Sequence, residues 1–266
     1  MKITNNIIPG LCSISFRQLE AEDIISLCRE LGIPAIEWGG DIHAPHGDAA
    51  RGKQLSRLCR DAGISCPSYG SYYRVGISEA QGLPFSDVLS SARALGAETV
   101  RVWGGIKNYT EYSPSELDAA VRDLRRIADL ASAEGLTVSL EYHENSLTHT
   151  PEAVEALDKA VSRQSVRYYW QPPHVLNDQA CLNSLVDLGE RLTNIHVFQW
   201  RLTEFREQDK RIERLPLEVG IPRWRRFLAA LEGNRTHYAF LEFVKGDDPQ
   251  QLRRDWESFC KILEKK

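Results

Sequence analysis

The sequence has no long apolar run, no CxxC pair and little net charge, and each absence excludes a class of protein. No stretch approaches the roughly 20 apolar residues of a membrane span, and residues 1–8 hold no apolar run of signal-peptide length. A formal net charge of −4 over 266 residues gives no general basic surface for nucleic acid or anionic lipid. We therefore expect a cytoplasmic location, with neither nucleic acid nor membrane as a partner.

The six cysteines lack the spacing of a metal site or of a redox pair. Each falls in an apolar stretch of helical or strand character, and none stands at ligand-like spacing from a histidine. This pattern predicts buried free thiols in a reducing compartment. The residues concerned are Cys12, Cys28, Cys59, Cys66, Cys181 and Cys260.

Short β-branched or aromatic runs alternate with longer segments of helical period along the whole chain. This alternation is typical of parallel β/α units, and 266 residues match the roughly 250 residues of one eight-stranded barrel. No linker or low-complexity segment interrupts the pattern. We therefore predict an α/β fold, a single (β/α)₈ TIM barrel domain over residues 1–266. Its strands are expected at Ile8–Ile14, Ala35–Trp38, Ser65–Tyr72, Thr99–Trp103, Thr137–Tyr142, Val166–Trp170, Asn194–Trp200 and Tyr238–Val244.

Helix ends are marked by capping residues. Ser113-Pro114-Ser115-Glu116 has the form of a capping box with a first-turn proline. Four glycines each follow a helical run and precede the next strand, which predicts a left-handed residue just after each helix; they are Gly32, Gly63, Gly96 and Gly135. Two connections, Gly70–Pro84 and Arg201–Gly220, are longer than ordinary loops, and we interpret them as candidate lids or substrate contacts because they follow strands.

Two glutamates stand in apolar runs at the ends of predicted strands. Glu141 closes Val138-Ser139-Leu140-Glu141, and Glu242 lies within Ala239–Val244. A carboxylate buried there without a partner would be costly. One interpretation is a salt bridge to an arginine such as Arg101; the other is that both glutamates hold a divalent metal with His196. Arg101 itself is expected to be buried, either contacting a substrate oxygen or pairing with Glu37 or Glu141.

These strand ends resemble the xylose-isomerase-like barrel superfamily, which includes sugar isomerases and epimerases, inosose-processing enzymes and endonuclease IV. The resemblance covers the whole chain. It rests on Leu-Glu-x-His at Glu141–His143, the Gln171-x-x-His174 spacing, His196 on the seventh strand and Leu-Glu242-Phe near the end. It implies a metal site whose ligands are Glu141, Gln171, His196 and Glu242.

One position departs from the family pattern. The second ligand in relatives is usually an aspartate, whereas this chain has Gln171. An amide oxygen can still bind a hard cation, but the site loses one negative charge. The expected ion is Mn²⁺, Mg²⁺ or Co²⁺, with Zn²⁺ as a further candidate.

The resemblance also implies a reaction. Glu141 and Glu242 would act as acid and base, moving a proton between a hydroxyl-bearing carbon and an enediolate in a monosaccharide or keto-sugar. His143, His174, Arg101 and Arg201 are expected to contact substrate. This predicts a sugar isomerase or epimerase. A keto-sugar or inosose dehydratase or lyase would use the same glutamates and is the first alternative.

Aromatic residues at the strand ends support a sugar-like ligand independently. Indole faces pack on sugar C–H groups, although a layer of aromatics can equally plug the top of a barrel. The tryptophans that end strands two, four, six and seven are Trp38, Trp103, Trp170 and Trp200. We expect at least two of them to face the ligand.

Further function classes remain open at this stage. A two-carboxylate glycoside hydrolase also places glutamates and tryptophans at strand ends, but it has no necessary use for His196. A non-catalytic sugar-binding barrel is favoured by the change to Gln171. An endonuclease IV-like enzyme is disfavoured because the seven histidines do not supply its three-metal cluster. Homo-oligomers are common in relatives, so self-association is an expectation.

Overall fold

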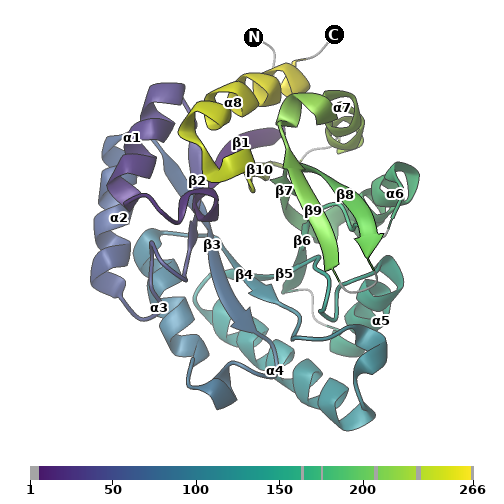
Figure 1. The fold of residues 1–266 in the computed structure, drawn as a ribbon. Helices are drawn as coiled ribbons and strands as arrows, with labels where there is room; N and C mark the ends of the chain where they lie inside the picture. The colour runs from purple at the N-terminus through teal and green to yellow at the C-terminus, as the bar shows by residue number, and fades with distance from the viewer. Residues whose placement is uncertain (1–5, 163–164, 175, 207–208, 232–234, 265–266) are drawn as a thin grey trace.

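Eight parallel strands close into a barrel in the order β1-β10-β7-β6-β5-β4-β3-β2, which confirms the predicted fold. The computed structural model describes residues 6–162, 165–174, 176–206, 209–231 and 235–264. Helices form a ring outside the strands (Figure 1). The barrel strands are β1 (Ile7–Cys12), β2 (Ala35–Gly39), β3 (Ser65–Arg74), β4 (Thr99–Trp103), β5 (Thr137–Glu141), β6 (Val166–Trp170), β7 (Leu192–Val197) and β10 (His237–Leu241).

The helices begin and end largely where capping residues predict. Ser113 and Glu116 form the expected capping box at the start of α4, and Gly32, Gly63, Gly96 and Gly135 all have positive φ angles, between 70° and 77°. Within the described chain, no helix combines the length and apolarity needed to span a membrane. The helices are α1 (Ala21–Leu31), α2 (Ala49–Asp61), α3 (Phe85–Leu95), α4 (Pro114–Ala133), α5 (Pro151–Val161), α6 (Asp178–Leu188), α7 (Ile221–Ala229) and α8 (Pro249–Leu263).

Strand alternation decides which side chains enter the barrel. Successive residues of a strand point to opposite faces, so in β5 Ser139 and Glu141 point inward while Leu140 packs outward. Ser139 reaches across to Thr193 of β7, with 2.6 Å between the hydroxyl oxygens. A small inner cluster fills part of the barrel and is separate from the large core between strands and helices; it comprises Cys12, Ile14, Ala35, Tyr169 and Phe240.

The segment after β7 differs from the sequence prediction. The predicted strand Asn194–Trp200 is two elements: β7 ends at Val197, and β8 (Gln199–Arg206) then pairs antiparallel with β9 (Asp209–Leu215). The second predicted loop, Arg201–Gly220, is therefore largely a hairpin. The two strands of this hairpin pair with each other and not with the barrel. Because the hairpin is not part of the barrel, its charged sequence lacks the hydrophobic pattern that would predict a strand.

Candidate metal and active site

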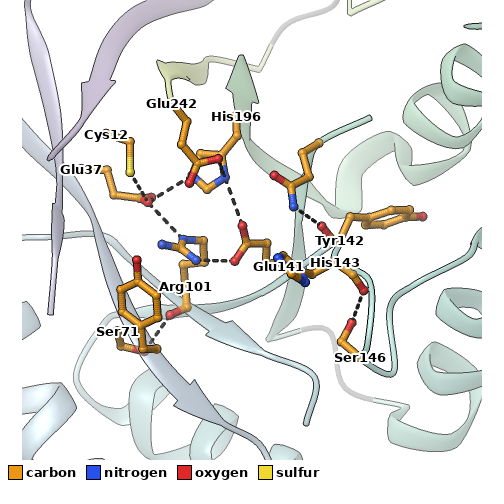
Figure 2. Close-up of polar contacts among 12 residues, drawn as sticks. Cys12, Glu37, Ser71, Arg101, Glu141, Tyr142, His143, Ser146, His196 and Glu242 are labelled. Atoms are coloured by element: carbon orange, nitrogen blue, oxygen red, sulfur yellow. Dashed lines mark hydrogen bonds and ion pairs between the residues drawn. The ribbon is translucent and has the colours of Figure 1, made fainter. Parts of the chain in front are cut away.

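Five ionisable side chains from five different strands meet inside the carboxyl end of the barrel (Figure 2). None is more than 3% exposed. Because parallel strands all end at the same rim, residues far apart in the sequence converge there. They are Glu37 of β2, Arg101 of β4, Glu141 of β5, His196 of β7 and Glu242, which directly follows β10.

The two ring nitrogens of His196 face different carboxylates. Nδ1 lies 3.2 Å from Glu141 Oε1 and 3.3 Å from Glu242 Oε2. Nε2 lies 3.1 Å from Glu37 Oε1. The imidazole therefore divides the site into a side formed by Glu141 and Glu242, and a side formed by Glu37 and its partners.

On the Nε2 side of His196, both oxygens of Glu37 accept hydrogen bonds. Its Oε1 accepts from Arg101 Nε at 3.0 Å and from the Cys12 thiol at 3.3 Å. Its Oε2 accepts from the Ser68 hydroxyl at 2.7 Å. Burial raises the pKa of Cys12 to about 12, so its sulfur is a thiol that donates. Arg101 lowers the pKa of Glu37 against the effect of burial, so Glu37 is ionised.

Electrostatics make Glu141 and Glu242 unequal. Burial raises the pKa of both carboxyls, but at Glu141 the adjacent Arg101 and His196 together outweigh burial and the pKa falls to about 2. At Glu242 burial dominates and the pKa rises to about 7, although His196 opposes the rise. Burial lowers the pKa of His196, but Glu242 and Glu37 together raise it well above its usual value.

Among the residues that the structure describes, two groups of side chains could hold a metal ion, and they share His196. Cys12, Glu37 and His196 form one, and Glu141, His196 and Glu242 form the other. In the first group the Arg101 guanidinium already supplies the positive charge. In the second, Glu242 Oε2 and His196 Nδ1 are buried and have no hydrogen-bond partner among the described residues. Carboxylate and imidazole donors suit a divalent cation such as Mn²⁺ or Mg²⁺, so the second group fits a metal.

Gln171 fits the same interpretation. It follows β6, the strand between those of Glu141 and His196, and it shares the inward face of Tyr169, whose ring is 4.6 Å from that of His196. Its Nε2 donates to the Tyr142 carbonyl at 2.6 Å. Its Oε1 is buried and, within the described chain, accepts no hydrogen bond. The amide oxygen is thus left available as a neutral ligand.

Two aromatic–histidine pairs lie beyond the strand ends. Trp103 stacks on His143 with 4.1 Å between ring centroids. Trp200 packs on His174 at 4.0 Å, and its indole also contacts Phe243, the residue after Glu242. Trp103 ends β4 and His143 follows β5, whereas His174 follows β6 and Trp200 lies in β8. They include four of the residues that the sequence predicted as substrate contacts.

Three other predicted substrate contacts lie away from the cluster. Trp170 points outward, where its indole packs on Trp224 and Phe227 and donates to the Ser184 hydroxyl at 3.0 Å. Trp38 is fully buried and, as the neighbour of inward-pointing Glu37, faces the opposite side of β2. Arg201 is exposed on the hairpin and pairs with Glu213 at 2.7 Å.

Arg101 lies within the cluster, but its contacts are with protein groups. Nε pairs with Glu37 and Nη1 with Glu141, so both salt bridges that the sequence left as alternatives are present. Sequence analysis did not assign Glu37 to the site. Strand alternation could have predicted it. Glu37 lies two residues after Ala35, an inner-barrel residue, and therefore points inward as Ala35 does, whereas Trp38 points outward.

Backbone strain marks the same rim. Tyr72 and Phe243 have positive φ angles of 55° and 53°, a conformation that is unfavourable for bulky residues. Phe243 directly follows Glu242, and the Tyr72 ring lies 5.6 Å from the Arg101 guanidinium carbon. Such strained residues concentrate at functional sites.

Several solved structures resemble the fold of this chain. A probable 3-DHS dehydratase from Bacillus anthracis, AsbF, is 18% identical with a TM-score of 0.78, over 94% of this chain and 98% of that one. A xylose isomerase-like TIM barrel protein from Mycobacterium smegmatis in complex with magnesium is 17% identical with a TM-score of 0.71, over 99% and 98%. D-psicose 3-epimerase, solved in the presence of D-fructose, is 16% identical with a TM-score of 0.71, over 95% and 97%.

No curated protein matches the sequence significantly, and the structural likenesses, all below 20% identity, show the fold alone. The sequence itself nevertheless matches a family model over residues 25–262, which is most of the chain. On that match, and with a barrel that closes as the model requires, the chain belongs to the xylose isomerase-like TIM barrel family.

Proposed function

We propose that the protein is a divalent-metal-dependent isomerase or epimerase that moves a proton on the carbon next to a carbonyl group of a monosaccharide or keto-sugar. One observation carries the proposal: two buried carboxylates, Glu141 and Glu242, flank the same imidazole nitrogen at 3.2 and 3.3 Å. The similar structures that include a D-psicose 3-epimerase and a magnesium complex support this choice.

Glu141, His196, Glu242 and the Gln171 oxygen would hold the metal. When bound, a divalent ion stabilises negative charge that develops on a carbonyl oxygen as a neighbouring C–H bond breaks. The side chains described above leave these ligand atoms without competing donors, apart from the Arg101 contact to the other oxygen of Glu141.

Glu141 and Glu242 would carry the proton. A carboxylate takes a proton from carbon when it lies within reach of it, and a second carboxylic acid returns one to the same or the neighbouring carbon. Arg101 neutralises Glu141 directly and does not form an ion pair with Glu242. The two carboxylates therefore differ in their readiness to hold a proton, as an acid–base pair requires.

The aromatic pairs would orient the substrate. Trp103 with His143 and Trp200 with His174 present flat faces on which sugar C–H groups can pack, while histidine nitrogens can bond hydroxyl groups. Both tryptophans are only partly buried, so part of each indole is open to a ligand.

Isotope exchange tests the proposal. The protein is incubated in D₂O with Mn²⁺, Mg²⁺ or Co²⁺ and a panel of ketoses, aldoses and keto-acids, and ¹H NMR follows loss of C–H signal and any new epimer. We expect exchange that Glu141→Gln and Glu242→Gln abolish. The matched control is Glu98→Gln, at an exposed position just before β4 at the opposite end of the barrel.

The outcomes separate the candidate functions. Exchange with a new epimer or isomer supports the proposal. Loss of water to an unsaturated product would instead assign a dehydratase to the same carboxylates. No exchange with any substrate or metal would contradict both and favour a sugar-binding barrel.

A further inference from the structure

Glu37, Arg101, Glu141 and His196 form a closed ring of contacts across the barrel (Figure 2). Glu37 Oε1 accepts from Arg101 Nε at 3.0 Å and lies 3.1 Å from His196 Nε2. Arg101 Nη1 pairs with Glu141 Oε2. Glu141 Oε1 then faces His196 Nδ1 at 3.2 Å. These contacts tie together β2, β4, β5 and β7, so the imidazole cannot rotate without breaking another contact.

We propose that Glu37 and Arg101 are positioning residues that commit His196 Nε2 to a hydrogen bond and so present Nδ1 to Glu141 and Glu242. The assignment of Nδ1 to a metal rests on the proposed function. The Glu37 oxygen that faces Nε2 already accepts hydrogen bonds from Arg101 and Cys12, so it acts as an acceptor and the proton between it and Nε2 belongs to the imidazole. A carboxylate on the far nitrogen fixes the ring orientation of a metal-binding histidine and strengthens it as a ligand.

Glu37 is a support and not a ligand because its oxygens are already used. Oε1 accepts from Arg101, Cys12 and His196, and Oε2 accepts from Ser68. The side chain is fully buried. A metal at this oxygen would have to displace the Arg101 guanidinium or lie beside it as a second buried positive charge.

Gly70 has no side chain, and this leaves room for the four contacting side chains. This residue of β3 pairs with Gly39 of β2 and with Arg101 of β4. A Cβ at Gly70 would lie 2.5 Å from Arg101 Nη2 and 3.2 Å from Glu37 Oε1. Any larger residue would push the guanidinium away from its position between the two carboxylates.

Histidine NMR on the wild-type protein tests the orientation without a mutation. Protein labelled with ¹⁵N-histidine is studied without metal, and the His196 ring is assigned through its backbone. We expect a proton on Nε2 that exchanges slowly with water. On addition of Mg²⁺ or Zn²⁺, Nδ1 should show the larger ¹⁵N shift and Nε2 should keep its proton.

Metal affinity tests the contribution of Glu37. Mn²⁺ binding is measured by EPR and calorimetry for wild type, Glu37→Gln and the control Glu79→Gln, which breaks an arginine pair on the exposed surface with Arg126. We expect Glu37→Gln to weaken Mn²⁺ binding by about 10–100-fold and to speed exchange of the Nε2 proton. Glu79→Gln should bind as wild type does.

Each result decides one proposal. A His196 ring protonated on Nδ1 alone, or a Glu37→Gln affinity within about twofold of wild type, would overturn the positioning role. If Glu37→Gln does not fold, the wild-type NMR result decides. A wild-type chain that binds no Mn²⁺ would overturn the proposed function, whereas the Nε2 proton and its exchange would still report whether Glu37 holds His196.

Discussion

The two sides of His196 differ in how completely their side-chain oxygens are hydrogen-bonded by the protein. On the Nε2 side, Glu37 has donors on both oxygens and an arginine beside it. On the Nδ1 side, Glu242 Oε2 and Gln171 Oε1 are buried without hydrogen-bond partners among the described residues. Buried polar atoms are nearly always satisfied, so acceptor oxygens that lack a donor, beside a carboxylate whose two oxygens both have donors, mark a place that a cation can complete. One side therefore supports the fold and the other serves binding.

The largest expected effect comes from breaking the supporting side. Arg101→Met leaves Glu37 and Glu141 buried as uncompensated charges, and we expect the free energy of unfolding to fall by about 3–5 kcal/mol. Urea denaturation at neutral pH measures it. Arg126→Met, at a partly exposed ion-pair network, is the control and should lose about 1 kcal/mol or less. Equal losses in the two variants would remove the distinction between the sides.

A substitution at Glu242 is expected to affect metal binding more than stability. Glu242→Gln keeps the contact to His196 Nδ1 within reach of an amide and changes an oxygen, Oε2, that accepts no hydrogen bond from the described residues, so the free energy of unfolding should change by no more than about 1 kcal/mol. Mn²⁺ affinity should fall by at least about 100-fold, since the site loses a charged ligand. Calorimetric titration and urea denaturation of the same preparation measure the two quantities. A variant that is strongly destabilised yet still binds Mn²⁺ would place Glu242 on the supporting side.

Gln171 offers a gain of function on the binding side. Gln171→Asp restores one negative charge beside the metal ligands, and we expect Mn²⁺ affinity to rise by about tenfold. The control is Gln81→Asp, which makes the same charge change at an exposed position between β3 and α3. Unchanged affinity in Gln171→Asp would show that the residue is not a ligand, and would leave three protein ligands for the ion.

The smallest effect is expected on the surface, away from both sides. Contacts from Lys107 and Ser113 lower the pKa of exposed Glu116 to about 2. A lowered carboxyl pKa adds stability above the ordinary value of 4.5, and that stability is lost as pH falls toward 2. Glu116→Gln should therefore melt slightly below wild type at pH 6, and the difference should shrink toward pH 2. A difference in Tm that is constant with pH would contradict this origin.

Some strand assignments were recoverable from local patterns and others were not. Thr99–Trp103 and Val166–Trp170 match β4 and β6 residue for residue, because each is a buried β-branched or aromatic run bounded by polar residues. The strand predicted at Asn194–Trp200 instead breaks after Val197, where the chain leaves the barrel and begins the hairpin. That exit depends on Trp200 packing against Phe198 and Phe243, a contact that local periodicity does not contain.

The sequence by itself determined the barrel and the residue types at its rim, since strand runs, capping residues and strand-end polar residues are local features. It also brought Glu141, His196 and Glu242 into one hypothesis through a family resemblance. Only the tertiary structure decided that Glu37 belongs with them, that Trp170 faces the helices, and that Arg101 joins two carboxylates. The reason is geometric: closing the barrel sets which inward side chains meet across it, and Glu37 contacts His196 over a separation of 159 residues.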